Sequence, residues 1–393
     1  MQSMALFTLE PHNARCNPTA MKPTSLPTSK ASQVSREAPG LPRAFVSSRE
    51  VAARAGVSRS AVSRTFTPGA SVSGETRQRV LRAAAELGYH VNHLARGLMR
   101  RETGIVCLVA ADMSSPQGSR LVRGIAEALQ AIGKVAMTIS IAGPDDDAAS
   151  ALQKTIDYRA DATVVLSGTP AQSIVRTCLD NGQRLILISR DDQIEGPDNI
   201  QLDNTGAASL ACRAFLRGGC RRLAVVNSEL GTPALMAREA AFVAAARAVG
   251  LEPVAVRHGR ATSYDSGVNA GRRLLTGPEQ PDAVFAVNDL MACGVMDVAR
   301  LEFGLSVPGE LSIIGFDDIP QAGWLSYALT TFSQPVDRIA QSIVSLISEG
   351  DRETGRAPAR IVLQPEVIWR RTVRVLGNSS GMSSSPFCAA SRP

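Results

Sequence analysis

The sequence has few aromatic residues, few histidines and no long hydrophobic run. Aromatic residues make up 4% of the 393 positions, and the four histidines, at 12, 90, 93 and 258, follow no metal-binding spacing. No stretch approaches the roughly 18 consecutive apolar residues that a membrane span needs. The first residues include Glu10 and no basic segment leading into an apolar one, so we expect neither a membrane protein nor a secreted one.

Other absences argue against catalysis. The chain contains no G-x-x-x-x-G-K-[ST] phosphate loop and no G-x-S-x-G nucleophile elbow. Its seven cysteines form no C-x-x-C pair and fall mostly in apolar segments, which is typical of reduced core residues in a cytosolic protein. We therefore expect a cytoplasmic protein that is not an enzyme and that holds no metal or cofactor.

Charge is distributed unevenly along the chain. Residues 1–101 hold 15 Lys and Arg against 5 Asp and Glu, whereas the remainder holds 27 against 31. A basic excess confined to one segment is typical of a surface that neutralises phosphates. The 44% of hydrophobic residues is enough for a large core in the rest of the chain.

The basic segment contains two short amphipathic helical patterns joined by a tight turn at Gly56 and Val57. Ser47 followed by Glu50 predicts a capping box at the start of the first helix. The second helix opens at Ser58, and its predicted outward positions carry hydrogen-bond donors and no acid: Arg59, Ser60, Ser63 and Arg64. Such a pair fits the DNA major groove, although an ordinary helical hairpin with a solvated basic face would show the same pattern.

A third helical pattern follows Ser73 and ends at Gly88, with an expected apolar face of Val80, Leu81, Ala84 and Leu87. We thus predict a three-helix DNA-binding domain over 45–90. Residues 91–102 predict a short basic hinge helix with Leu98 protruding, which suits a wedge in the minor groove but also a flexible charged linker. Residues 1–44 and 377–393 are low in complexity and predict disordered ends.

From 103 to 376 strand-like runs alternate with helical ones. The alternation predicts α/β architecture with parallel sheets, and it occurs in two halves, before and after Asp203. We expect two lobes with a ligand between them at the carboxyl ends of the strands. The polar residues near those ends include Ser189, Arg190, Arg238, Asn288 and Asp317.

An arginine fork with Asp and Asn acceptors suits a small polyhydroxylated ligand, because each hydroxyl both donates and accepts. We expect Asp289 and Asp318, by contrast, to cap helices and cross-link loops. A two-lobe core alone would equally suit a free-standing solute-binding protein, but the basic three-helix segment and the lack of an export signal favour a regulator.

Several motifs in collinear order strengthen the hypothesis that the protein is a regulator. They are VSSREVAARAGVSRSAVSR at 46–64, L-G-Y at 87–89, N-x-x-A-R-x-L at 92–98, VNDLMACG at 287–294, IIGFDDIP at 313–320 and LTTFSQP at 329–335. In these motifs the sequence resembles the LacI/GalR family of bacterial transcription regulators. The resemblance implies a homodimeric repressor of a double-stranded operator, with a helix-turn-helix domain and a periplasmic-binding-protein-like core that binds a sugar-like effector.

Position by position, the resemblance implies base contacts by Arg59, Ser60 and Arg64, phosphate contacts by Ser47, Ser58 and Ser63, and a minor-groove wedge at Leu98. It also implies effector contacts by Arg190, Arg238, Asn288 and Asp317. The sequence departs from the family where Ser115-Pro116-Gln117-Gly118 replaces Asn-Pro-Phe-Phe. The usual aromatic wall is missing there, so Gln117 predicts a more polar effector contact, and a non-sugar effector stays open.

Overall fold

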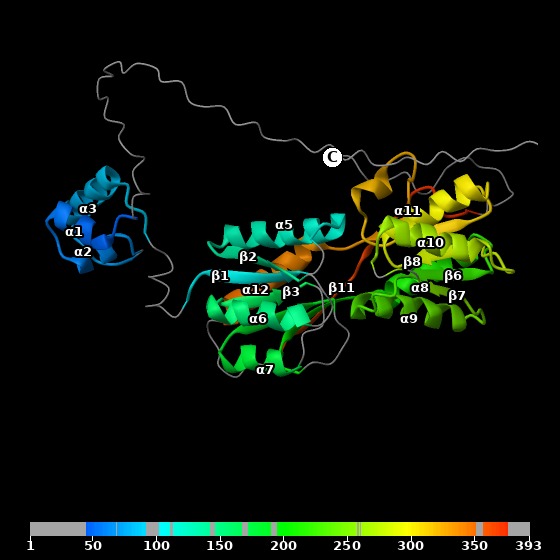
Figure 1. Ribbon diagram of the computed structural model, residues 1–393, viewed down its shortest axis with the longest axis horizontal. Helices are drawn as coiled ribbons and strands as arrows, with labels where there is room; N and C mark the ends of the chain where they lie inside the picture. The colour runs from blue at the N-terminus through cyan, green and yellow to red at the C-terminus, as the bar shows by residue number, and fades with distance from the viewer. Residues whose placement is uncertain are drawn as a thin grey trace, which may run out of the picture. The chain divides into compact units, whose positions relative to one another are not determined.

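The computed structural model describes residues 45–67, 69–91, 102–110, 113–141, 146–166, 172–189, 195–257, 259, 261–350 and 357–375. The chain divides into two compact units, Met1–Val91 and Asn92–Pro393 (Figure 1). Within the described residues no helix combines the length and apolarity that crossing a membrane requires. The predicted disordered ends and nearly all of the predicted hinge, including Leu98, lie outside the described residues.

The first unit contains the helices α1 (Ser48–Ala55), α2 (Arg59–Thr65) and α3 (Gly74–Leu87). The predicted capping box is present, since Glu50 N donates to Ser47 Oγ and Ser47 N donates to Glu50 Oε2. Gly56 ends α1 at φ 64°, a left-handed conformation that favours glycine, and it makes the sharp turn into α2. The three predicted helices are therefore confirmed.

A small core holds these helices together. Its buried members are Val51, Ala52, Ala55, Val62, Val80, Ala83 and Ala84. The prediction that Leu81 belongs to this core is wrong, because its side chain is 47% exposed. The buried face of α3 follows the spacing i, i+3, i+4 from Val80, and Leu81 lies about 100° further round the helix.

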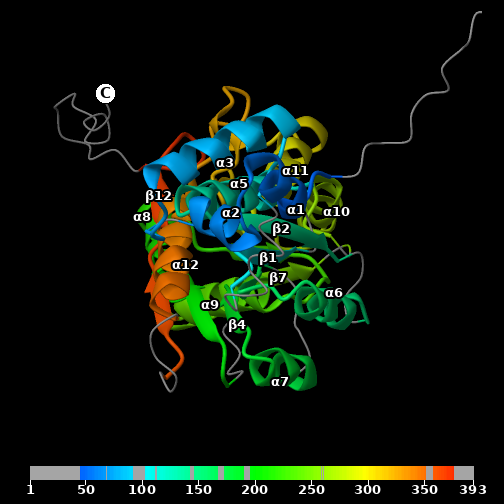
Figure 2. The same ribbon diagram turned by 90° about the vertical axis from the view of Figure 1, so that its left-hand side faces the viewer.

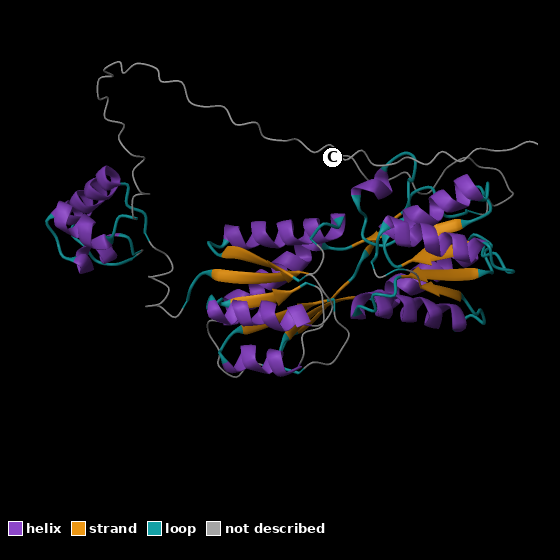
Figure 3. Ribbon diagram, in the orientation of Figure 1, coloured by secondary structure: helices purple, strands orange, loops and turns teal. Residues whose placement is uncertain are grey.

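The second unit consists of two lobes, each with a parallel sheet between helices (Figure 3). Lobe 1 has the strand order β11-β5-β4-β3-β1-β2. Its strands are β1 (Ile105–Ala110), β2 (Val135–Ser140), β3 (Ala162–Val165), β4 (Arg184–Ile188), β5 (Asp198–Leu202) and β11 (Arg360–Leu363). Its helices are α5 (Pro116–Ala131), α6 (Asp146–Asp157), α7 (Gln172–Asp180) and α12 (Val336–Gly350).

Alternate residues of the lobe 1 strands point to opposite faces of the sheet. In β4, Ile186 and Ile188 belong to the main hydrophobic cluster, whereas Leu185 and Leu187 belong to a separate one with residues of α6 and α7. The helices α5 and α12 contact each other and cover the first face, and α6 and α7 cover the second (Figure 2). Burial on both faces explains why the central strands β1, β3 and β4 are almost continuously apolar.

Lobe 2 has the strand order β7-β6-β8-β9. Its strands are β6 (Leu223–Asn227), β7 (Val254–Arg257), β8 (Ala283–Ala286) and β9 (Ser312–Ile314). Its helices are α8 (Asn204–Arg217), α9 (Pro233–Arg247), α10 (Tyr264–Leu275) and α11 (Asp289–Asp297), the last followed by a π-helical turn, η1 (Val298–Glu302). The helices α8 and α9 pack on one face and α10 and α11 on the other (Figure 1).

The last part of the chain returns from lobe 2 to lobe 1. After a 3-10 turn, η2 (Pro320–Gly323), the strand β10 (Thr331–Ser333) pairs antiparallel with β12 (Glu366–Ile368). Between them, α12 and β11 join lobe 1, where β11 pairs with β5. The sequence does not predict this return, because β11 and β5 are far apart in the chain and their pairing leaves no local pattern. The strand β5 and the helix α8 were not predicted either.

Candidate DNA-binding and effector sites

The helix α2 presents a polar face to solvent. Its residues Val62 and Thr65 are buried against α1 and α3, which fixes the rotation of the helix about its axis. The opposite face is exposed and consists of Arg59, Ser60, Ser63 and Arg64, with the helix cap Ser58 beside it. All four predicted residues of this helix thus lie on one accessible surface.

The two arginines of this face are not engaged in the fold. Among the described residues, the side chains of Arg59 and Arg64 form no hydrogen bond or ion pair, although the backbone carbonyl of Arg64 accepts from Thr67 N. Ser58 Oγ accepts from Ala61 N at 3.2 Å and lies 2.8 Å from Ser60 Oγ, while Ser47 is occupied with Glu50. Free guanidinium groups at the surface can pair with phosphates or with guanine edges.

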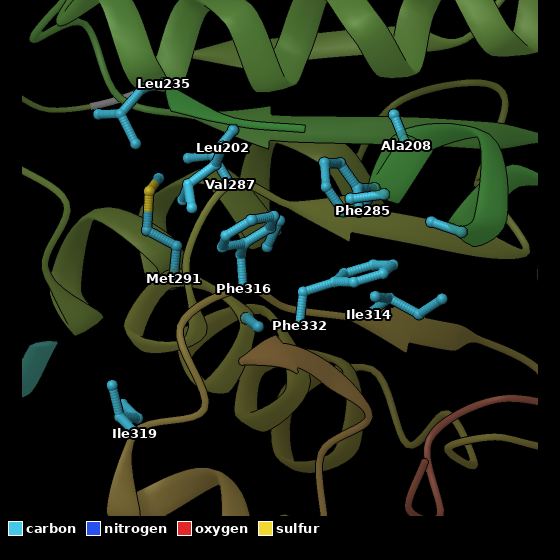
Figure 4. Close-up of a cluster of buried hydrophobic side chains, with 14 of the residues drawn as sticks. Leu202, Ala208, Leu235, Phe285, Val287, Met291, Ile314, Phe316, Ile319 and Phe332 are labelled. Atoms are coloured by element: carbon cyan, nitrogen blue, oxygen red, sulfur yellow. The ribbon is translucent and has the colours of Figure 1, made fainter. Parts of the chain in front are cut away.

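A second candidate site lies in lobe 2 around Arg238 on α9. The Arg238 side chain is 4% exposed, and its Nη1 donates to Val287 O at 2.8 Å. The same nitrogen lies 3.6 Å from Asp317 Oδ1, and the guanidinium carbon stands 3.6 Å from the centre of the Phe316 ring. Figure 4 shows Phe316 among Leu235, Val287 and Met291, which all belong to the main hydrophobic cluster. Both members of the ion pair are buried.

Asp317 follows the end of β9 in an unusual backbone conformation. Its φ is 117° and that of Asp318 is 53°, so two consecutive residues other than glycine adopt positive φ. Gln334 Nε2 donates to Asp317 Oδ1 at 2.6 Å. Burial raises the pKa of Asp317 to about 6, although Arg238, Gln334 and Arg120 act in the opposite direction.

Asp289, at the start of α11, forms hydrogen bonds with the loop that carries Asp317 and with β10. Its carboxylate accepts from Ile319 N at 2.9 Å and from Thr331 Oγ1 at 2.5 Å, and its own N–H donates to Phe316 O. Burial and the nearby Asp317 raise the pKa of Asp289 to about 7. The Asp318 carboxylate forms an ion pair with Arg370 at 2.6 Å. Both aspartates therefore cross-link loops, as the sequence predicts.

Asn288 and Ser189 lie at strand ends, but the fold already uses some of their polar atoms. Asn288 caps α11 through Met291 N, and its Nδ2 donates to Thr262 O at 2.8 Å. Ser189 follows β4 at φ 56°, with its N–H donating to Ile200 O. Arg190, the next predicted contact, lies outside the described residues.

The first turn of α5 brings lobe 1 to the loop that carries Asp317. Arg120 Nη1 lies 3.4 Å from Asp318 O, which is a direct contact between the lobes. Gln117 is one turn earlier on the same helix, and both its Oε1 and its Nε2 are buried without a hydrogen-bond partner. Arg238, Asp317 and Gln117 thus lie on segments that converge where the lobes touch.

The chain matches known proteins over both units. Residues 49–92 match the family model of bacterial regulatory proteins, lacI family, and residues 212–373 match that of the periplasmic binding protein-like domain. The transcriptional regulator CelR of Thermobifida fusca is 30% identical over 334 residues, which cover 82% of this chain and 96% of CelR. The chain belongs to the LacI family.

Other LacI-family proteins match over a similar extent. The transcriptional repressor CytR of Escherichia coli is 28% identical over 331 residues, covering 84% of this chain and 96% of CytR. A Lac repressor dimer bound to operator and the anti-inducer ONPF has the same fold, with a TM-score of 0.76 at 21% identity, covering 84% of this chain and 99% of that one. A CelR–cellobiose complex gives a TM-score of 0.62 at 26% identity, covering 83% and 99%.

Membership of the LacI family establishes the class of function. The protein is a helix-turn-helix, DNA-binding regulator of transcription, and the alternative of a free-standing solute-binding protein is wrong because the DNA-binding unit is present. The sequence did not point to the residues that support the site, such as Arg120, Gln334 and Thr331. Their roles depend on contacts between segments that are far apart in the chain.

Proposed function

We propose that this LacI-family protein is a cytoplasmic, homodimeric repressor whose affinity for a near-palindromic operator is controlled by a small sugar-like effector bound between the lobes. The observation that carries the effector proposal is the Arg238–Asp317 pair, which is buried over Phe316 on a strained loop. Strained backbone and buried charge are costly to maintain, and they cluster at ligand sites. A polyhydroxylated ligand suits an arginine fork beside a carboxylate.

The exposed face of α2 supports the DNA-binding part of the proposal. We assign Arg59, Ser60 and Arg64 to the base edges of the major groove, and Ser47, Ser58 and Ser63 to phosphates. Leu98 is the proposed minor-groove wedge, on sequence grounds alone. The regulator has no catalytic residue in this scheme.

An apolar surface on lobe 2 supports a homodimer. Leu325 and Leu301 are 95% and 82% exposed, and Trp324 is more than half exposed. The two segments meet where Arg300, next to Leu301, donates to the carbonyl of Ser326, next to Leu325. Aromatic and large aliphatic side chains in such a patch are typical of a protein interface. A twofold dimer would present two DNA-binding units to the two half-sites of an operator.

Two measurements on the full chain test the proposal. Operators are first selected from random double-stranded DNA and verified by band shift at moderate salt, with Arg82→Ala on the exposed side of α3 as a control for lost charge. A panel of sugars, sugar acids and polyols is then screened by thermal shift, since a ligand that binds only the folded state raises Tm. A sugar that raises Tm and changes operator affinity supports the proposal. A sugar that does so equally well in Arg238→Ala contradicts the assigned site.

A further inference from the structure

The Asp161 carboxylate, just before β3, binds the two residues that lead into β1. Its Oδ1 accepts from Thr103 N at 2.7 Å, and its Oδ2 accepts from Gly104 N at 2.9 Å. The ammonium group of Lys134, just before β2, donates to the same Oδ2 at 2.8 Å. The side chains of Asp161 and Lys134 are only 12% and 16% exposed. Removing one of them would leave the other charge poorly solvated and unpaired, so this contact is costly to break.

Backbone hydrogen bonds fix the same stretch of chain from both sides. Gly104 O accepts from Val135 N, and Ile105 O accepts from Asp161 N, each at 2.8 Å. The φ of Gly104 is 74°, a left-handed conformation that favours glycine. Thr103 adds its hydroxyl, which lies 3.0 Å from Asp161 Oδ1. Lobe 1 therefore fixes both the position and the direction of the chain where it enters β1.

This fixed stretch is the place where the chain passes from the DNA-binding unit to lobe 1. The DNA-binding unit ends at Val91, and residues 92–101, which lie outside the described residues, are its covalent link to lobe 1. The chain enters β1 at the end of the sheet that points away from lobe 2 (Figure 1). Beyond the other end of β1 lies α5, whose Arg120 contacts Asp318 O of lobe 2. One rigid sheet thus connects the contact between the lobes to the attachment point of the DNA-binding unit.

A second buried ion pair in lobe 1 has the same arrangement at a different strand. Asp198, the first residue of β5, accepts from Arg184 Nε at 2.7 Å and from Ala359 N at 2.7 Å. The side chains of Asp198 and Arg184 are 8% and 18% exposed. Ala359 leads into β11, so this carboxylate fixes the entry to β11 as Asp161 fixes the entry to β1. The two aspartates are therefore matched in burial and bonding but differ in the segment that they hold.

We infer that Asp161 is a positioning residue for operator binding: it fixes the point on lobe 1 from which the DNA-binding unit is attached, and so sets the half-site spacing that the dimer prefers. When two binding units share one tethered assembly, the gain from the second contact depends on the length and stiffness of each tether. Without Asp161 the tether lengthens by the residues before β1, and its direction is no longer set by lobe 1. Affinity at the preferred spacing then falls, and other spacings are better tolerated. This inference rests on the proposed homodimer and its two half-sites.

The test compares Asp161→Asn with Asp198→Asn in the full chain. Band shifts use a selected operator, the same operator with base pairs inserted between its half-sites, and random DNA of equal length. We expect Asp161→Asn to bind the selected operator roughly 10-fold more weakly and to lose part of the wild-type preference for its spacing. Affinity for random DNA should not change, because it depends on phosphate contacts and not on spacing. Asp198→Asn should keep the wild-type affinity and spacing preference.

Thermal unfolding separates a structural role from a positioning role. Both asparagine variants should lower Tm by similar amounts, because each leaves a buried basic side chain without its carboxylate. Thr103→Val removes only the hydroxyl beside Asp161, so it should melt near the wild-type Tm and change the spacing preference in the same direction by a smaller factor. If Asp161→Asn does not fold, Thr103→Val alone decides.

Three results would count against these ideas in different ways. An unchanged spacing preference in Asp161→Asn and Thr103→Val would overturn the inference and leave the proposed repressor intact. An equal change in Asp198→Asn would show that any loss of stability in lobe 1 has this effect, which also overturns the inference. A wild-type protein that binds all spacings equally would contradict the proposed dimer on two half-sites, and the inference with it.

Discussion

The guanidinium of Arg238 lies 3.6 Å above the ring of Phe316, the residue immediately before Asp317. Stacking on the ring and the hydrogen bond to Val287 O fix the position of the guanidinium, so its orientation does not depend on a ligand. Through these two contacts Arg238 holds α9 against the residues that follow β8 and β9. A ligand at this arginine would therefore act on the loop that contacts lobe 1 through Asp318 O.

Replacing Arg238 with alanine should abolish the ligand response and leave operator affinity nearly unchanged. The variant leaves Asp317 buried without its cation, so we also expect a loss of unfolding free energy of about 3 kcal/mol. Calorimetry with a stabilising sugar measures ligand binding, band shifts measure operator affinity, and urea unfolding measures the free energy of unfolding. Arg272→Ala, which breaks an exposed ion pair with Glu302, is the control and should cost less than about 1 kcal/mol.

Replacing Arg64 with alanine should weaken operator binding by about 1–3 kcal/mol and relax the preference at one base position, if Arg64 pairs with a base edge. Band shifts on operators with single base changes measure both effects. Arg82→Ala should reduce affinity equally, and only slightly, on all operators. Unchanged relative affinities in Arg64→Ala would mean that Arg64 contacts phosphate instead.

Stability should depend on pH through Asp289. Its pKa is raised to about 7 in the folded protein, so the folded state binds a proton more tightly than the unfolded state between about pH 4 and 7. The unfolding free energy that this carboxyl contributes therefore falls as pH rises through that window, by up to about 1.4 kcal/mol per pH unit. Subtracting the urea unfolding curves of Asp289→Asn from those of the wild type at pH 5 to 8 isolates this slope. A pH-independent difference would contradict the assignment, and Asp318→Asn, paired with Arg370, serves as the comparison.

Helix packing in lobe 2 should be sensitive to a single methyl group. A Cβ at Gly267 of α10 would lie 2.3 Å from Met291 O of α11, against backbone that cannot move aside. We expect Gly267→Ala to lower the unfolding free energy by about 1–3 kcal/mol. Gly74 at the start of α3 has open space around its Cβ position and an ordinary φ, so Gly74→Ala should be neutral or stabilising. Equal Tm values for the two variants would disprove the close packing.

Leu98→Ala should weaken specific DNA binding far more than non-specific binding, if Leu98 opens the minor groove only in the specific complex. Affinities for a selected operator and for random DNA, measured at the same salt concentration, decide this. Equal losses on both would make the segment around Leu98 an electrostatic linker.

Local patterns in the sequence were enough to place the DNA-binding helices and most of the α/β alternation. The caps Ser47, Ser58 and Ser73 and the turn at Gly56 depend only on residues within one helical turn, so they could be predicted directly. The error at Leu81 came from counting an apolar residue one position off the buried face. Apolar periodicity does not reveal that the helical stretch after β8 is divided into α11 and the π-helical turn η1.

The tertiary structure decided which distant segments of the chain come into contact and which side chains are buried. By itself the sequence determined the three-helix unit, the two-lobe core and the resemblance that identifies the family, because these depend on periodicity and on short motifs. The return of β11 to lobe 1, the Arg238–Asp317 pair and the unpaired amide of Gln117 depend on which distant segments meet and on how completely they exclude water. Burial and pairing are properties of the packed chain, so no local pattern in the sequence could reveal that Gln117 lacks a partner.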